Sequence, residues 1–192
     1  MTVSVYLGSS IHCDKKYNVL ACELGHAMAE CGYDIVYGGS NVGTMKDLAD
    51  GAMAAGGRVT GVFPRSFRGS RDIWGAGIEV QRRDLTEIIE VADFAERKKL
   101  MEELGDCCVV LPGSFGTLDE MFTYACDRSI DKHTKNIYVL NHEGYYDPVV
   151  QLIANMSDSG FLKPHLRNMF TFCATLDELM KNLRILSETL AK

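Results

Sequence analysis

The sequence predicts an α/β fold, in which a doubly wound, mainly parallel sheet carries helices on both faces. Short apolar runs alternate along the chain with segments of helical period, which is the pattern of such a sheet. The run CCVVL (107–111) has no polar interruption, as expected of a central parallel strand that is buried on both faces. With 192 residues, 46% of them hydrophobic, the chain can bury a sizeable core, and its length fits a single domain over residues 1–192.

The first third of the chain is expected to form three strands and two helices. VSVYL (3–7) predicts the first strand, and a helix over about 14–31 follows it. The apolar side chains of this helix recur at spacings of three and four and form one core-facing stripe. They are Tyr17, Leu20, Ala21, Leu24, Met28 and Cys31. YDIVY (33–37) is the second strand, a helix over about 44–55 comes next, and RVTGVF (58–63) is the third strand.

The rest of the chain repeats the alternation after one irregular stretch. Residues 64–77 form the longest segment without periodicity, and long loops in compact domains tend to be functional or mobile. The elements expected after it are strands at 86–92, 107–111, 136–140 and 169–173, and helices at 93–104, 117–130, 145–159 and 175–190.

Charge and hydropathy exclude several classes of protein. The net charge of −6 and the sequence pI near 5.4 repel polyanions, so we expect neither a nucleic acid nor an anionic membrane as partner. No apolar stretch approaches the ~20 residues that span a bilayer, and the N-terminus lacks the features of a signal peptide. We therefore expect a cytoplasmic protein.

The cysteines and histidines do not predict a metal site. The seven cysteines, an odd number, form no C-x-x-C pair, and the five histidines form no H-E-x-x-H motif. Reduced and mostly buried thiols are the expected state of these cysteines.

Two strands end in glycine clusters that lead into helices, VYGGSNVGT (36–44) and VLPGSFGT (110–117). Ligands bind at the carboxyl ends of parallel strands, and helix starts there favour anions. The alternative is that glycine only makes sharp turns. Together the two turns predict a phosphate cradle, with Gly39, Gly43 and Thr44 in the first turn and Gly113 in the second as candidate contacts.

Known phosphate loops do not match these turns. The glycines of GGSNVG are spaced as in a Walker A loop, but Thr44 stands where that motif needs lysine. The turn after the first strand, GSSIHC, lacks G-x-G-x-x-G, so ordinary dinucleotide binding is poorly supported.

The sequence TLDE occurs at 117–120 and again at 175–178. Thr-x-x-Glu at a helix start is a capping box, and this explains the second copy. The first copy is either another capping box, or it places the Glu120 carboxylate at the edge of the glycine cradle.

The segment AERKKLM contributes basic side chains just before the buried 107–111 strand. A solvated basic face is the ordinary interpretation. Alternatively, Arg97 or Lys98 reaches a phosphate or a leaving group, and arginine suits a bidentate contact with an oxyanion.

Three motifs in this order, GGSNVGTM, ERKKLM and PGSFGTLDE, resemble those of the LONELY GUY family of cytokinin-activating phosphoribohydrolases, whose members are often labelled lysine decarboxylases. The resemblance covers nearly the whole chain. It implies a Rossmann-like domain, a homodimer, and hydrolysis of the N-glycosidic bond of a nucleoside 5′-monophosphate to free base and ribose 5-phosphate. It implies neither a metal nor an organic cofactor.

The resemblance also assigns roles to residues of this chain. Arg97 and Glu120 would be the catalytic pair. The residues that would contact the nucleotide substrate are Glu79, Lys98, Ser114, Phe115, Gly116, Thr117 and Leu118.

The chain departs from the family pattern at four positions. Ser40 and Ser114 stand where glycines are usual, and we expect both near the phosphate, where a hydroxyl can donate a hydrogen bond. Phe94 and Ala95 stand where methionine and histidine are usual, and they can reshape the pocket of the base.

Cleavage of a ribosyl C1′–N bond builds positive charge on the sugar, which a fixed carboxylate at Glu120 would stabilise while it orients or deprotonates water. Arg97 would offset charge on the leaving base or clamp the phosphate. Two other functions compete with hydrolysis. One is a nucleotide-binding protein without catalysis, and the other is a pyridoxal-phosphate lysine decarboxylase, for which no Schiff-base lysine is evident.

Overall fold

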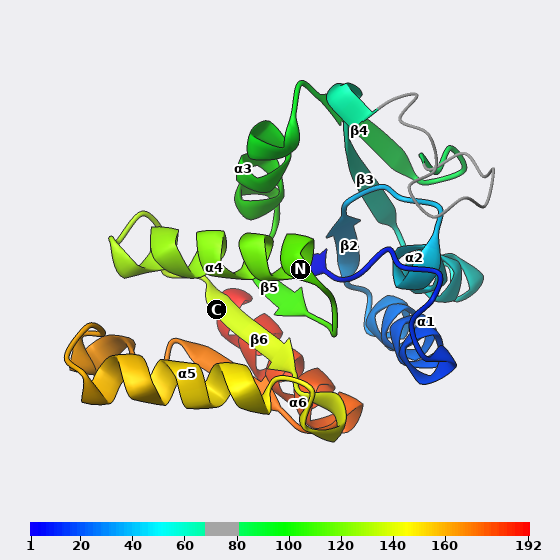
Figure 1. The fold of residues 1–192 in the computed structure, drawn as a ribbon. Coiled ribbons are helices and arrows are strands. Elements are labelled where there is room, and N and C mark those ends of the chain that lie inside the picture. The colour runs from blue at the N-terminus through cyan, green and yellow to red at the C-terminus, as the bar shows by residue number, and fades with distance from the viewer. Residues whose placement is uncertain (68–80) are drawn as a thin grey trace.

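The computed structural model of the protein describes residues 1–67 and 81–192, and within them seven strands form one parallel sheet (Figure 1). The strand order is β4-β3-β2-β1-β5-β6-β7. The strands are β1 (Thr2–Tyr6), β2 (Asp34–Tyr37), β3 (Val59–Pro64), β4 (Glu87–Val91), β5 (Cys107–Val110), β6 (Asn136–Leu140) and β7 (Phe170–Cys173). All six pairings between neighbouring strands are parallel. The predicted doubly wound α/β class is therefore confirmed.

In the same described residues, six α-helices cover the two faces of this sheet. They are α1 (Lys15–Glu30), α2 (Gly43–Ala54), α3 (Phe94–Leu104), α4 (Phe115–Ser129), α5 (Asp147–Asp158) and α6 (Leu176–Leu190). Three short 3-10 helices, η1 (Arg65–Phe67), η2 (His142–Gly144) and η3 (Pro164–Leu166), lie in the connections. Each predicted element is present, and its ends lie within a few residues of the expected ones.

The core has two parts, one on each face of the sheet. Side chains of β1 alternate between them: Val5 packs in the part that contains buried side chains of α1, α2 and α6, while Tyr6 packs in the part formed with α3, α4 and α5. Figure 1 shows α1 and α2 on one side of β2 and α3 and α4 on the other. Burial on both faces explains why the central strand β5 is apolar throughout.

The chain direction across the sheet reverses at β1. From β1 the strands β2, β3 and β4 follow one another toward one edge, whereas β5, β6 and β7 follow toward the other. The connections after β1 and β5 therefore lead to helices on opposite faces of the sheet, and the carboxyl ends of these two neighbouring strands form the point where open α/β sheets bind ligands.

Helix α4 begins two residues earlier than expected. Ser114 occupies the position before the first helical residue, Phe115, so Thr117 lies inside the first turn. The capping-box interpretation of Thr117 and Glu120 is therefore wrong.

The second TLDE copy caps its helix through Thr175 as predicted, but Glu178 reaches back to the residue before the cap, Ala174, and not to Thr175 itself. The Glu178 N–H donates to Thr175 Oγ1 over 3.2 Å, and Glu178 Oε2 accepts from the Ala174 N–H over 2.8 Å. Among the described residues, no helix combines the length and apolar character needed to cross a membrane.

Candidate active site

A cavity of about 230 Å³ opens at the carboxyl ends of β1, β2, β3 and β5. We call it the crevice. Its lining residues are Leu7, Gly8, Ser9, Gly38, Ser40, Val42, Met45, Phe63, Pro64, Phe67, Phe94, Arg97, Ser114, Gly116, Thr117 and Glu120. The crevice thus lies at the edge of the sheet where the sequence predicts a ligand site.

Arg97 of α3 and Glu120 of α4 meet in the crevice. Arg97 Nη2 donates to Glu120 Oε1 over 2.5 Å, and the two side chains are only 12% and 4% exposed. A side chain at Gly38 would bring a Cβ atom within 3.0 Å of Arg97 Nη1. Glycine at this position therefore lets the guanidinium lie against the end of β2.

Burial of the Glu120 carboxyl raises its pKa above the usual range for glutamate, and the neighbouring Arg97 charge opposes this rise. Burial dominates because only 4% of the side chain is exposed. A glutamate with a raised pKa exchanges a proton closer to neutral pH than an exposed one, which suits a general base or acid.

Three phenylalanines form one wall of the crevice. We call Phe63, Phe67 and Phe94 the aromatic wall. The ring centroids of Phe63 and Phe67 are 6.1 Å apart, and those of Phe67 and Phe94 are 5.6 Å apart. Arg97 Cζ lies 4.8 Å from the centre of the Phe94 ring, within the range of a cation–π contact. The guanidinium is thus held by a carboxylate and by a ring.

The start of α4 faces the crevice through Ser114, Gly116 and Thr117. The first N–H groups of a helix have no partner inside the helix. Among the described residues, no side chain caps α4, and none caps α2, whose start follows the other glycine turn. By contrast, α1, α3 and α6 are capped by Asp14, Asp93 and Thr175. An uncapped helix start at a crevice is an anion-binding feature.

Helix α5 also starts without a side-chain cap within the described part of the chain, but Pro148 stands in its first turn. Because proline has no N–H, one of the free donors is absent there. The start of α5 is therefore a weaker anion site than those of α2 and α4.

The first glycine turn holds the loop that follows β1. Gly43 has a φ of 58°, and a Cβ atom there would lie 2.6 Å from the backbone of Ser9 and Ser10. Thr44 Oγ1 donates to the Gly8 carbonyl over 2.6 Å. Gly39, with a φ of 71°, packs on β3. These three candidate contacts shape the turn, and Gly38, Ser40 and Val42 are the residues of the turn that line the crevice.

A second cavity of about 150 Å³ adjoins the crevice and shares Gly8, Ser9 and Ser114 with it. Thr44 and Gly113 line this second cavity. A Cβ atom at position 113 would lie 2.1 Å from Thr117 Oγ1 and 3.0 Å from the Gly8 nitrogen. Gly113 is therefore needed for the close approach of the loops after β1 and β5.

Some predicted contacts lie away from the crevice. The Lys98 ammonium binds Asp119 over 2.8 Å and Thr123 over 3.1 Å. Phe115 is 89% exposed, and Leu118 packs against the core. Glu79 lies outside the described residues.

Sequence reasoning missed several lining residues. Phe63 could have been found, because it ends the predicted strand at 58–63 and the carboxyl end of that strand lies at the ligand edge. Phe67 and Met45 carried no signal of a site. In the described part of the chain, no group of three or more His, Cys, Asp or Glu side chains is arranged to hold a metal ion.

The fold and the site define a doubly wound α/β protein with an anion-binding helix start and a buried glutamate–arginine pair in one crevice. A family model described as "Possible lysine decarboxylase" matches residues 45–183. A cytokinin riboside 5′-monophosphate phosphoribohydrolase of Rhodococcoides fascians is 35% identical over 183 residues, which cover 95% of this chain and 89% of that protein. A protein of the same name from Arabidopsis thaliana is 32% identical over 94% of this chain and 76% of its own. The chain belongs to this family, the LONELY GUY family that its motifs resemble.

Solved structures show the same fold at lower identity. The X-ray structure of TM1055 has a TM-score of 0.71 at 21% identity and covers 95% of this chain and 98% of that one. A molybdenum cofactor carrier protein from Chlamydomonas reinhardtii has a TM-score of 0.71 at 19% identity, over 100% and 98% of the two chains. At these identities the likeness concerns the fold alone.

Proposed function

We propose that this protein hydrolyses the N-glycosidic bond of a nucleoside 5′-monophosphate and releases a free base and ribose 5-phosphate. The observation that carries the proposal is the buried Glu120 carboxylate, paired with Arg97 and lying in the same crevice as the uncapped start of α4. The names of the relatives at 32–35% identity support this reaction class.

The phosphate belongs at the start of α4. There the free N–H groups and the helix dipole favour an anion, and no carboxylate belongs to the first turn of the helix. Glu120 lies one turn further along the same helix. A phosphate held at the start of α4 would therefore place the ribose beside the carboxylate and turn remote binding energy into orientation at C1′.

The chemical step needs one carboxylate and one cation. A water oxygen attacks C1′ as the C1′–N bond breaks, and the electron pair of that bond goes to the base nitrogen. The Glu120 carboxylate stabilises the positive charge on the ribose ring and accepts the proton of the water, and the base nitrogen takes up one proton as the base leaves, so that the site returns to its starting state. Arg97, whose guanidinium lies against the end of β2, offsets the negative charge on the leaving base.

The crevice fits this reaction better than the lysine decarboxylase chemistry in the description of the family model. Such chemistry needs a lysine that forms a Schiff base with pyridoxal phosphate. Among the described residues that line the crevice there is no lysine, and the Lys98 ammonium is bound to Asp119. These residues do not fit that cofactor.

The decisive experiment is incubation with AMP and with N6-substituted AMP, followed by chromatographic detection of free base and an assay for ribose 5-phosphate. Equal amounts of both products, absent with the Glu120→Gln variant, are expected. Saturable nucleotide binding without either product would instead establish the alternative of a binding protein that does not catalyse.

A homodimer is part of the proposal. An apolar groove of about 190 Å³ lies between α4, α5 and the segment before β7, with Phe122, Ile153, Met156 and Phe170 in its lining. These side chains are buried or half-buried. An apolar groove on the surface is typical of interfaces between subunits. Sedimentation equilibrium should give twice the mass of the chain, and the mass of a single chain would contradict this part of the proposal.

A cytoplasmic location is proposed as well. All seven cysteines are free thiols, and three of them, Cys107, Cys108 and Cys173, are buried. Free thiols persist in reducing compartments. Fractionation of cells that express the protein would test the location.

A further inference from the structure

Four buried polar side-chain atoms among the described residues have no hydrogen-bond partner: Ser40 Oγ, Gln81 Oε1, Arg97 Nε and Tyr124 Oη. Buried polar atoms in native proteins are nearly always paired, so each exception calls for an explanation. Ser40 and Arg97 both line the crevice. Two unpaired polar atoms from residues on one cavity wall point to groups of a ligand as their missing partners.

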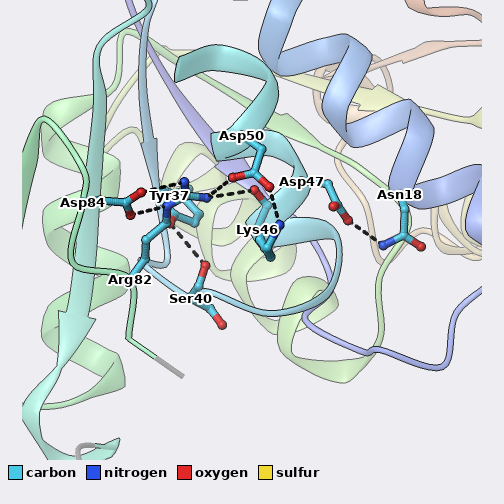
Figure 2. A network of polar contacts seen from close by, with 8 residues as sticks. All are labelled: Asn18, Tyr37, Ser40, Lys46, Asp47, Asp50, Arg82 and Asp84. Carbon is cyan, nitrogen blue, oxygen red and sulfur yellow. Dashed lines mark hydrogen bonds and ion pairs between the residues drawn. The ribbon is translucent and has the colours of Figure 1, made fainter. Parts of the chain in front are cut away.

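The backbone around Ser40 is held firmly. The Tyr37 hydroxyl donates to the Ser40 carbonyl over 3.2 Å, and the Arg82 N–H donates to the Gly39 carbonyl over 2.9 Å. The Arg82 side chain, 7% exposed, binds Asp50 over 2.5 Å and Asp84 over 2.8 Å. Figure 2 shows the contacts of Tyr37 and of the Arg82 side chain, with the Ser40 carbonyl oxygen turned toward Tyr37 and the hydroxyl on the opposite side. The hydroxyl thus points away from the groups that fix the turn.

The sheet places Ser40 far from the proposed phosphate site. Ser40 follows β2, the start of α4 follows β5, and β1 lies between these two strands. Two strand spacings amount to about 10 Å. A phosphate at α4 cannot itself reach that far, but the ribose and the base that extend from it can.

The aromatic wall lies on the same side of the crevice. Phe63 is the last residue but one of β3, which lies one strand beyond β2. Phe94 stacks on the Arg97 guanidinium, which itself lies against Gly38. Flat apolar rings take a nucleobase by stacking, and they do so for any base. A group that distinguishes bases at this end must therefore be polar.

We propose that the end of the crevice formed by Ser40 and the aromatic wall binds the nucleobase, and that the Ser40 hydroxyl hydrogen-bonds the polar edge of the base and so takes part in choosing the substrate. This inference rests on the proposed function, because it takes a nucleoside 5′-monophosphate as the ligand. The sequence suggested that Ser40 contacts the phosphate, whereas this inference assigns its contact to the base.

The test compares a ligand that has a base with one that lacks it. Dissociation constants of AMP and of ribose 5-phosphate would be measured by calorimetry on Glu120→Gln protein, in which turnover does not interfere, with and without Ser40→Ala. Loss of one neutral hydrogen bond weakens binding by about threefold to tenfold. We expect Ser40→Ala to raise the dissociation constant of AMP by this factor, and to change the dissociation constant of ribose 5-phosphate by no more than twofold.

Two further variants make the outcome clear. Ser40→Gly removes the same hydroxyl and should reproduce the Ser40→Ala result, which guards against a local effect of the added methyl group. Ser114 lies at the start of α4, where the phosphate is expected. Ser114→Ala should therefore weaken the binding of AMP and of ribose 5-phosphate by the same factor.

Equal weakening of both ligands by Ser40→Ala, or no weakening of either, would overturn the inference, as would failure of the Glu120→Gln protein to bind AMP. Turnover by the wild-type protein, measured in parallel, tests the proposed reaction separately. Selective weakening of AMP binding in a protein that does not hydrolyse AMP would support the base site and contradict the hydrolysis.

Discussion

Arg97 and Glu120 lie 23 residues apart in the chain, yet their side chains meet over 2.5 Å inside the crevice. The buried strand β5 separates the two helices that carry them, and α3 and α4 pack on the same face of the sheet. Both charged side chains are largely shielded from water, so the charge of each is neutralised mainly by the other. A pair of this kind is costly to keep for stability alone, which favours a catalytic reason for its presence.

The first prediction concerns Glu120→Gln. The amide oxygen can still accept a hydrogen bond from Arg97, but it cannot stabilise a ribosyl cation or accept a proton from water. Turnover should fall by at least about 100-fold, the lower end of the effect of a positioned acid or base. The measurement is the initial rate of ribose 5-phosphate release, with circular dichroism to show that the variant is folded.

Glu178→Gln is the matched control, because Glu178 occupies the same place in the other TLDE copy. Glutamine also serves in a capping box, so the free energy of unfolding should change by less than about 1 kcal/mol. Turnover should stay at the wild-type level. If Glu120→Gln and Glu178→Gln had equal activity, Glu120 would have no chemical role.

The second prediction concerns pH. Burial raises the pKa of Glu120 above the ordinary 4.5, and Arg97 opposes this shift. Because the mechanism needs the ionised carboxylate, kcat/KM should fall as the pH drops through this raised pKa, at a higher pH than an exposed glutamate would give. Removing the positive charge by Arg97→Met should move this acid limb to still higher pH. An acid limb at or below pH 4.5 would contradict the assignment of Glu120 as the base.

The same shift has a consequence for stability. A carboxyl whose pKa is higher in the folded than in the unfolded protein binds more protons when folded. Its contribution therefore favours the folded state at low pH and is lost as the pH rises through the folded pKa. The Glu120→Gln variant should lack this component in its curve of unfolding free energy against pH.

Most of the fold could be predicted from the sequence, because apolar runs and helical periods set each element locally. The start of α4 could not be placed, because Ser114 precedes the helix without a capping bond, whereas Thr117 and Glu120 imitate a capping box. The sequence indicated the cap of α6, but it did not indicate that α2 and α4 start without a side-chain cap. That depends on how the loops after β1 and β5 approach one another.

The site was predictable only in part. The resemblance named Arg97 and Glu120 as a pair, but their direct contact follows from the way α3 and α4 flank β5. Lys98, the next residue to Arg97, points to a different partner, Asp119, because successive residues on a helix face about 100° apart. Neighbouring residues in one motif therefore need not share a site.

The third prediction concerns the aromatic wall. Phe94→Leu keeps apolar bulk but removes the ring face on which the Arg97 guanidinium lies. Because a cation–π contact contributes about 0.5–2 kcal/mol, kcat should fall by about threefold to thirtyfold as Arg97 loses its alignment. Phe67→Leu, which removes a ring that contacts Phe94 and Phe63, should raise KM more than it lowers kcat. Steady-state kinetics of both variants separate the two effects, and identical kinetic changes in them would exclude a special role of Phe94.

The fourth prediction separates glycines that shape the turns from a glycine that makes room for substrate. At Gly43 a Cβ atom would meet backbone at 2.6 Å in a left-handed conformation, so Gly43→Ala should lower the free energy of unfolding by at least about 2 kcal/mol. At Gly116, in the first turn of α4, a Cβ atom would have no described heavy atom within 4 Å. Gly116→Ala should therefore leave the protein as stable as the wild type, or more so, since alanine favours helix.

The kinetics of Gly116→Ala should nevertheless change. Gly116 lines the crevice where the phosphate is expected to approach the backbone N–H groups, and an added methyl group would hold the anion away from them. KM for AMP should rise by about tenfold, since loss of a charged hydrogen bond costs about 1.5 kcal/mol or more. Thermal unfolding and steady-state kinetics on the same preparation test both halves of the argument. A stable Gly116→Ala protein with an unchanged KM would mean that the phosphate does not rest on the start of α4, and the order of phosphate, ribose and base along the crevice would have to be reversed.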